Sequence, residues 1–322
     1  MCTSAEGRGL VHHGLLHPPS ADLADVFAPL VAERLACAQS VLVVLPAATA
    51  AKLQGRLPIL AGLHIADPGG LYRHPGRVLG HYLSWITETS PGEPATIVAA
   101  PDPGGDDSYR AALWMHIDAL ANQALGACDL TLVCAYANDP ATVAAVRQAH
   151  PSLLNGAVIP SPDHLPPEQF LANHPLPPPS ELGQPDIVRI IDDPCQLIEL
   201  RQVVGSHVAR AGLPVDRCED FVLAVTEVAS NALEHGAPPA AVCLWTASTS
   251  VVCQISDNGR FTQPLAGLLP QANQGRGRGL WMAHQLCDQL YRWPDPTTIR
   301  LHMDRPPVSL LDRQTAPVQR WE

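Results

Sequence analysis

Short apolar runs alternate with segments of helical spacing in the first half of the chain. Residues 40–45 (SVLVVL) are apolar throughout, as expected of a strand buried on both faces of a sheet. Between residues 21 and 37 the apolar side chains instead recur at the spacing of one helix face. The same alternation predicts an α/β domain with a mainly parallel sheet. Its other strands are expected at residues 10–16, 96–100 and 130–136, and its other helices at residues 75–89, 109–125 and 141–150.

The order of elements changes in the last third of the chain. A short strand is followed by two long helices, two adjacent strands, a glycine-rich loop, a short helix and a final strand. This order predicts an α+β two-layer sandwich, with a mixed sheet and helices on one face. The expected elements are strands 187–191, 242–246, 251–256 and 298–303 and helices 195–211, 216–235 and 280–286.

A proline-rich segment separates these two patterns. Residues 160–186 contain prolines at a density that disfavours helix interiors and central strands, so they predict an extended linker. The linker divides an α/β domain at residues 8–159 from a second domain at residues 187–305. Residues 306–322 have no periodicity and are expected to form a loosely held tail.

Charge and composition exclude several classes of function. The net charge of −11 argues against nucleic-acid binding. No run reaches the ~20 apolar residues of a membrane helix, and the start of the chain lacks a signal-peptide layout, so we expect a cytoplasmic protein. Lys52 is the only lysine and does not lie in a glycine-rich phosphate loop. P-loop ATPases and eukaryotic-type protein kinases need such a lysine, and both are excluded.

Cysteines and histidines give no local metal-binding signature. The nine cysteines include no C-x-x-C pair, which argues against a zinc site or a disulfide framework. His12, His13 and His116 are most simply interpreted as structural histidines in strands or in the core, with a metal-ligand role as the alternative.

Three polar motifs in the last third carry candidate chemistry. In TEVASNALEHG, Glu227 and Asn231 lie one turn apart on one face of a predicted helix. An amide oxygen can bind a hard cation such as Mg²⁺, and a carboxylate can accept a proton from a nucleophile. A solvated polar face has the same spacing, so this motif alone does not define a site.

The other two motifs are SDNGR and GRGRGLWM. In the first, Asp257 follows an apolar strand and can accept a hydrogen bond from an amine such as that of adenine, while Gly259 would let a flat ring approach the backbone. The second offers backbone N–H groups at a helix start, together with Arg276 and Arg278, for phosphate groups. The alternatives are an ordinary turn for SDNGR and a flexible surface loop for GRGRGLWM.

The order of these motifs resembles the GHKL ATPase superfamily. That order is E-x-x-x-N-A-x-x-H-G, D-x-G, G-x-G-L and a final strand with two threonines, and it follows the N box, G1 box and G2 box of the superfamily's ATP site. The phrases SNALEHG, SDNGRF and GRGLWMAHQLCD are similar to the anti-sigma-factor serine/threonine kinase branch. The resemblance implies a Bergerat-type sandwich that binds ATP and Mg²⁺.

The resemblance also implies a role for each matching residue. Asn231 would bind Mg²⁺, Asp257 the adenine amine, and Glu227 would be the catalytic base. Gly259 would allow the ring to approach. The other residues that the resemblance places at the nucleotide are His235, Arg276, Gly277, Arg278, Gly279, Leu280 and Thr298.

The first domain resembles the MEDS sensory domain. The likeness is carried by GLVHHGLLH, SVLVVLP, HIDALAN, LVCAY and HPSLL, and it implies that the domain senses a small molecule of unknown identity. Together, the two resemblances imply a sensor-regulated anti-sigma-factor-type regulator. It would phosphorylate an antagonist of the anti-anti-sigma type on serine or threonine, sequester a sigma factor, or do both, and a homodimer is left open.

Two other functions fit the same motifs. The ATP-binding module could be a switch without catalysis, in which ATP sets the conformation that partners recognise. It could also be a histidine-kinase-like ATPase domain that acts on a separate protein. An ordinary sensor histidine kinase is disfavoured, because a proline-rich segment stands where a helical hairpin with a phosphoacceptor histidine would be expected.

Overall fold

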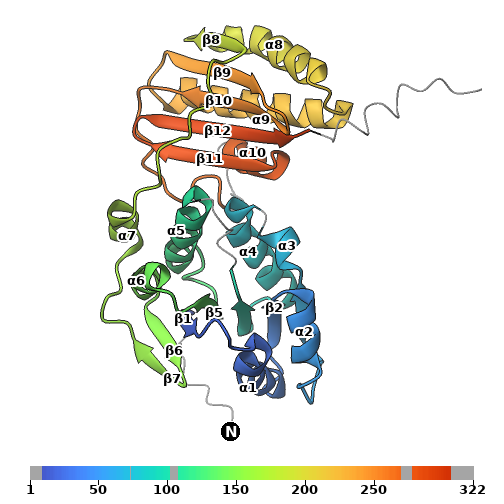
Figure 1. Ribbon diagram of the computed structural model, residues 1–322, viewed down its shortest axis with the longest axis vertical. Coiled ribbons are helices and arrows are strands. Elements are labelled where there is room, and N and C mark those ends of the chain that lie inside the picture. Colours follow the sequence, from blue (N-terminus) through green and yellow to red (C-terminus); the bar gives the residue numbers. More distant parts are fainter. Residues whose placement is uncertain (1–8, 73, 102–107, 270–277, 306–322) are drawn as a thin grey trace, which may run out of the picture. The chain divides into compact units, whose positions relative to one another are not determined.

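The computed structural model describes residues 9–72, 74–101, 108–269 and 278–305 (Figure 1). The chain divides into two compact units between Pro177 and Pro178. Unit 1 denotes the residues up to Pro177, and unit 2 those from Pro178 onward.

Unit 1 is built on a seven-stranded sheet with the strand order β3-β2-β4-β5-β1-β6-β7. Every neighbouring pair is parallel except the β6–β7 hairpin, so the predicted mainly parallel sheet is confirmed. The strands are β1 (Leu10–His17), β2 (Ser40–Val44), β3 (Leu63–Ala66), β4 (Ala95–Ala99), β5 (Leu130–Ala137), β6 (Ser152–Asn155) and β7 (Ala157–Pro160).

Helices pack on this sheet through apolar faces. Asp22 caps the first of them, α1, by accepting a hydrogen bond from the backbone N–H of Ala24 at 3.1 Å. Phe27 and Val31 of α1 are fully buried in a cluster with Val41 and Val43 of β2. The helices of unit 1 are α1 (Leu23–Ala36), α2 (Ala47–Gln54), α3 (Pro68–Leu71), η1 (Pro75–Arg77), α4 (Val78–Thr89), α5 (Ser108–Ala124), α6 (Pro140–Ala149) and α7 (Pro167–Asn173).

Helix α7 lies inside the segment for which the sequence predicts an extended linker. Pro167 occupies the first turn, where a proline is tolerated because its missing N–H would have no helical partner. Phe170 is fully buried and clusters with Ala119 and Ala149. The first half of the predicted linker therefore belongs to the core of unit 1.

One cysteine of the described residues, Cys37 at the end of α1, is disulfide-bonded. Among the residues that the structure describes, the free cysteines are Cys128, Cys134, Cys195, Cys218, Cys243, Cys253 and Cys287.

Unit 2 is an α+β sandwich with a five-stranded sheet in the order β11-β12-β10-β9-β8. All neighbouring strands are antiparallel, so the fold class is confirmed but the expected mixed sheet is wrong. The β9–β10 and β11–β12 pairs are hairpins, which can join only antiparallel strands, and β8–β9 and β10–β12 pair antiparallel across longer connections. The strands are β8 (Ile187–Ile191), β9 (Ala240–Thr246), β10 (Ser250–Ser256), β11 (Gln289–Pro294) and β12 (Thr297–Asp304).

The helices of unit 2 lie behind the sheet in the view of Figure 1. They are η2 (Pro194–Gln196), α8 (Leu197–Arg210), α9 (Val215–His235) and α10 (Gly279–Leu286). Helix α9 buries one face against the sheet because its apolar residues recur at helical spacing. Phe221, Val225, Val228 and Ala232 are the buried residues that show this spacing.

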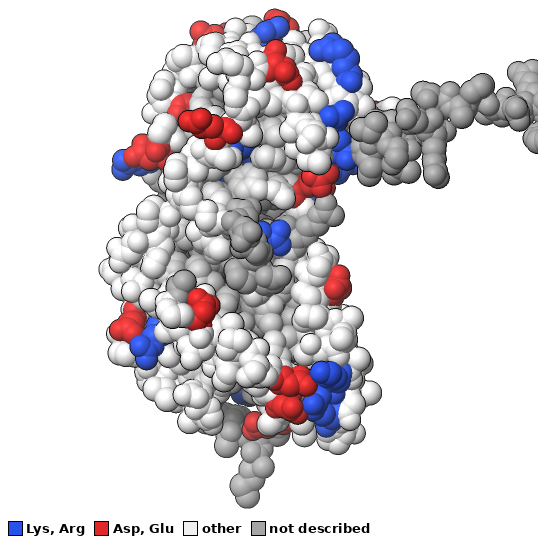
Figure 2. All heavy atoms as spheres, in the orientation of Figure 1, with Lys and Arg blue, Asp and Glu red and all other residues white. Residues whose placement is uncertain are grey.

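Charged side chains on the face in Figure 2 form small separate groups of both signs. Among the described residues, Lys52 and Arg56 pair with Asp22, and Arg56 also pairs with Asp25 at 2.7 Å. Within the described ranges, every helix is too short or too polar to cross a bilayer.

Candidate ATP site

Helix α9 presents Glu227 and Asn231 on one face. The two residues are one turn apart, and both side chains are half-buried. Val228 and Ala229, on the adjoining face of the helix, are buried in the core of unit 2. Packing of that apolar face therefore fixes the direction in which the carboxylate and the amide point.

The first turn of α10 lies directly against this polar pair. A Cβ atom added to Gly279 would lie 2.5 Å from Oε2 of Glu227 and 3.5 Å from the Asn231 side-chain nitrogen. Only a glycine fits there without a shift of the helix or of Glu227. The backbone N–H groups at the start of α10 thus stand close to the predicted Mg²⁺ ligand and the predicted base.

Asp257 follows β10 and is only 5% exposed. Its Oδ1 accepts hydrogen bonds from the backbone N–H groups of Ala237, at 3.0 Å, and Gly259, at 2.6 Å. Within the described part of the chain, Oδ2 has no hydrogen-bond donor. One oxygen of the carboxylate therefore holds two loops together, and the other remains an acceptor for a ligand.

The loop after α9 and the loop after β10 are also joined directly. The backbone N–H of Asn258 donates to the Ala237 carbonyl at 3.2 Å. A Cβ atom on Gly259 would lie 2.6 Å from Oδ1 of Asp257 and 3.1 Å from the Ala237 nitrogen, so a larger residue would separate the loops. The loop that contains Gly236 therefore packs closely against the loop that contains Gly259.

Strand β12 is hydrogen-bonded to the loop that contains Asp257 and Gly259. The Thr297 carbonyl accepts a hydrogen bond from the Asp257 backbone N–H at 3.0 Å, and the Thr297 N–H donates to the Gly259 carbonyl at 3.0 Å. Thr298 is 7% exposed, and its hydroxyl donates to Oγ of Ser256 at 3.1 Å. The predicted residues Asp257, Gly259 and Thr298 are thus brought together.

The remaining predicted residues lie in different surroundings. His235 is exposed at the end of α9, and Arg278 is exposed at the start of α10. Leu280 is buried in the core, where it packs on Gly267. Arg276 and Gly277 lie outside the described residues.

Sequence reasoning missed two groups that position Asp257. They are the backbone N–H of Ala237 and the backbone carbonyl of Thr297. Both act through the main chain, so the identity of their side chains carries no signal for them. The neighbouring Ser256 could have been found, because it directly precedes the D-x-G motif.

Residues 190–303 match the family model of the histidine kinase-like ATPase domain. The C-terminal region therefore contains a histidine kinase-like ATPase domain, and the candidate site lies within it.

Among solved structures, the chain is similar to the RsbU and RsbW domains of Rv1364c from Mycobacterium tuberculosis, with 22% identity and a TM-score of 0.27. That similarity covers 38% of this chain and 34% of the solved chain, so it spans about a third of the solved protein. The chain has no match among curated proteins.

Proposed function

We propose that unit 2 binds ATP together with Mg²⁺. The observation that carries this proposal is that the two carboxylate oxygens of Asp257 have different surroundings. Oδ1 accepts hydrogen bonds from two backbone N–H groups, and Oδ2 is left as an acceptor. An adenine amine is a donor that would satisfy Oδ2, and hydrogen bonds to an ionised acceptor are the stronger kind. The match to an ATPase family supports the same ligand.

The residues around Asp257 fit the rest of the nucleotide. Gly259 would let a flat ring approach the backbone, and Thr298 lies beside Ser256 on the adjoining strand. Asn231 provides an oxygen of the kind that Mg²⁺ prefers, next to the N–H groups at the start of α10. When bound, Mg²⁺ would neutralise charge on the phosphates.

Calorimetry with Mg-ATP on Asp257→Asn tests the adenine contact. The retained amide oxygen can still accept from Ala237 and Gly259, but an NH₂ group replaces Oδ2 and faces another donor. We expect affinity to fall by about 10- to 100-fold while the fold is kept. The neighbouring Asn258→Ala, at an exposed side chain, should leave affinity unchanged. A folded wild-type chain that binds no ATP, or equal affinities for both variants, would contradict the proposal.

We propose in addition that the protein is an anti-sigma-factor-type regulator that phosphorylates an antagonist protein on serine or threonine. In the transfer, the hydroxyl oxygen of the serine or threonine would attack the terminal phosphorus of ATP. Glu227 would accept the proton of that hydroxyl, and ADP would leave. The position of Glu227, beside Asn231 and the first turn of α10, supports this role.

Phosphoproteomics of cells that carry wild-type or Glu227→Gln protein tests the transfer. A partner should lose acid-stable phosphate on serine or threonine in the variant. Glu234→Gln is the matched control, since Glu234 is an exposed glutamate on the same helix. If the regulated genes respond identically in both variants, ATP is a conformational ligand and the output is sequestration of a sigma factor. Loss of acid-labile phosphate would instead favour a histidine-kinase-like activity in trans.

We also propose that unit 1 senses a small molecule, as its resemblance to the MEDS domain implies. A cavity of about 700 Å³ in this unit has the size of a small-molecule site and is lined by polar residues that include Arg34, Glu93 and Asp129. Compounds that raise the unfolding temperature of unit 1 should also change the ATP affinity of the full chain. Asp129→Ala should abolish that change but keep the ATP affinity measured without compound. Compounds that act equally on both proteins would exclude this cavity.

A further inference from the structure

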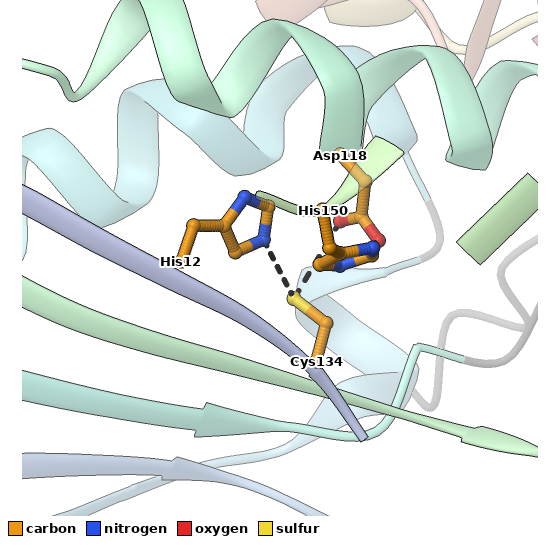
Figure 3. A group of neighbouring side chains, drawn as sticks. All are labelled: His12, Asp118, Cys134 and His150. Atoms are coloured by element: carbon orange, nitrogen blue, oxygen red, sulfur yellow. Dashed lines mark hydrogen bonds and ion pairs between the residues drawn. The ribbon is translucent and has the colours of Figure 1, made fainter. Parts of the chain in front are cut away.

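Four side chains of unit 1 converge on one buried point (Figure 3). His12 comes from β1, Cys134 from β5 and Asp118 from α5, and His150 directly follows α6. Their exposed fractions are 2%, 2%, 4% and 0% in that order. One ligand atom from each side chain lies within 4.8 Å of the others. We call these residues the buried cluster.

Hydrogen bonds fix the tautomer of His12. The Asn122 side-chain nitrogen donates to the carbonyls of Ala119, at 3.1 Å, and Ala149, at 2.9 Å. The side-chain oxygen of Asn122, Oδ1, therefore faces Nδ1 of His12 at 3.0 Å, and an amide oxygen can only accept a hydrogen bond. Nδ1 must carry the proton, so Nε2 of His12 has a free electron pair and points at Sγ of Cys134, 3.6 Å away.

The same reasoning applies to His150. Its Nδ1 lies 2.8 Å from the carbonyl oxygen of Val146, which can only accept, so Nδ1 carries a proton. Nε2 lies 3.3 Å from Oδ2 of Asp118, and among the described residues it makes no hydrogen bond. In neutral His150 this places a nitrogen electron pair opposite a carboxylate oxygen, and the two repel. A positive charge between or on them is needed for stability.

The distances within the buried cluster match those of a tetrahedral metal site. Sγ of Cys134 lies 3.6 Å from Nε2 of His12 and 3.6 Å from Oδ1 of Asp118, and Nε2 of His150 lies 3.3 Å from Oδ2 of Asp118. A Zn²⁺ ion with bonds of about 2.0–2.3 Å has ligands about 3.3–3.6 Å apart. These three separations have the spacing that such an ion requires, and one ligand atom from each of the four residues lies within 4.8 Å of the others.

We propose that His12, Asp118, Cys134 and His150 bind a Zn²⁺ ion. Two imidazole nitrogens, a thiolate and a carboxylate are the ligand types that zinc takes in proteins, and four protein ligands leave no open position for catalysis. The ion is structural, and it ties β1, β5, α5 and the end of α6 to one another. On binding, Cys134 gives up its thiol proton and becomes the thiolate ligand.

The surroundings of the buried cluster are those of a built metal site. Both histidines donate the Nδ1 proton to an oxygen, as zinc-binding histidines commonly do with the ring nitrogen that does not bind the metal, and the Tyr136 hydroxyl donates to Oδ2 of Asp118. Gly14 lies two residues after His12 on the same face of β1, and its lack of a side chain leaves room for the His150 ring. A Cβ atom there would lie 3.0 Å from the His150 ring and 2.8 Å from Val146.

The competing arrangement contains no metal. In it, His150 carries a second proton and forms an ion pair with Asp118, while the Cys134 thiol donates to His12. Both arrangements supply the positive charge, and they differ in whether unit 1 contains one metal ion for each chain and whether Cys134 is ionised.

Metal analysis of the full-length protein separates the two arrangements. Protein from zinc-supplemented cells should hold about one Zn²⁺ per chain after extensive dialysis. Protein refolded with Co²⁺ should show the intense visible bands of a tetrahedral site and a near-ultraviolet thiolate-to-cobalt band. Wild-type protein that is folded but holds far less than one equivalent in both preparations overturns the proposal.

Cys134→Ser and Cys128→Ser form a matched pair of variants. Cys128 is a half-exposed cysteine of the same unit outside the cluster. Cys134→Ser should lose the thiolate band and bind Co²⁺ at least tenfold more weakly, and Cys128→Ser should behave as wild type. If Cys134→Ser does not fold, the wild-type metal content and its band spectrum still decide. A thiolate band that persists in Cys134→Ser, or disappears in Cys128→Ser, also overturns the assignment.

Discussion

The candidate ATP site and the buried cluster differ in how their residues are distributed along the chain. Glu227 and Asn231 share one helix, and Asp257 and Gly259 share one turn, so each part of the ATP site is a local motif. In the buried cluster, His12 and His150 are adjacent in space although they lie near opposite ends of the sequence of unit 1. A ligand site assembled from local motifs can be read from sequence, whereas one assembled from single residues requires the fold.

The two sites also differ in what their polar groups do for the fold. Asp257 is held by backbone N–H groups of two adjoining loops, and its second oxygen is left for a ligand. Asp118 is buried and contacts Cys134, Tyr136 and His150 through its carboxylate. We therefore expect substitutions at Asp118 to affect mainly stability, and substitutions at Asp257 to affect mainly binding.

The largest expected effect is that of Asp118→Ala on unit 1. Burial alone raises the pKa of Asp118, but the neighbouring His150, His12 and Tyr136 lower it overall, so the carboxylate is ionised. Its removal leaves buried partners without their counter-charge and should destabilise unit 1 by about 3–5 kcal/mol. Hydrogen exchange of amides in β1 and β5 measures the loss. The amides of β10 in unit 2 are the internal control, and equal deprotection of both sheets would contradict the distinction.

A smaller effect is expected from acid on unit 2. Burial, and then the charge of Arg300, lower the pKa of His302 from 6.5 to about 4. The unfolded state binds the proton more readily, so the contribution of neutral His302 is complete above pH 6.5 and is lost as pH falls towards 4. The loss is about 3 kcal/mol at the acid limit.

Denaturant unfolding across this pH range checks the prediction for His302. His302→Gln should flatten the pH dependence of unit 2. His235→Gln, at an exposed histidine, should retain the wild-type dependence. A His302→Gln profile as steep as that of wild type would show that another group is responsible.

The smallest effect is expected from the contact that supports α10. Gly267 and Gly183 have φ angles of 81° and 73°, so an alanine is strained at either position. A Cβ atom on Gly267 would also lie 2.6 Å from Cγ of Leu280, whereas one on Gly183 meets nothing within 4 Å. Gly267→Ala should therefore destabilise unit 2 by about 1–2 kcal/mol more than Gly183→Ala.

Chemical denaturation gives that difference, and calorimetry shows whether it reaches the ATP site. Because Leu280 lies in the first turn of α10, a displaced Leu280 should also move Gly279 relative to Glu227 and weaken ATP binding. Equal stability and equal ATP affinity in the two variants would separate α10 from the site.

Elements with a strong apolar pattern could be predicted from sequence, and elements held by tertiary contacts could not. The run at residues 40–45 predicted β2 because both faces of that strand are buried. Strand β3 has only four residues, and Ile65 is 42% exposed, so it gives little pattern. Helix α7 was missed because prolines surround it and its position depends on the single buried side chain of Phe170.

The same contrast applies to the candidate sites. The order of the polar motifs predicted that Asp257 and Thr298 serve one nucleotide, and the antiparallel register of β10 and β12 does bring Ser256 opposite Thr298. No spacing rule joins His12 to Asp118, Cys134 or His150, because parallel pairing of β1 with β5 brings His12 near Cys134, and α5 and the end of α6 supply Asp118 and His150. The lack of a C-x-x-C pair argued against zinc but tested only ligands that are close in sequence.

The position of α7 decides where the chain can be divided for biochemical work. A fragment that stops at residue 159 loses Phe170 and leaves a hole beside Ala119 and Ala149, at a cost of about 3–5 kcal/mol. It also removes His174, whose carbonyl oxygen accepts a hydrogen bond from the buried His116. The first half of the proline-rich segment therefore fills part of the core of unit 1, and a fragment of this unit should end at Pro177.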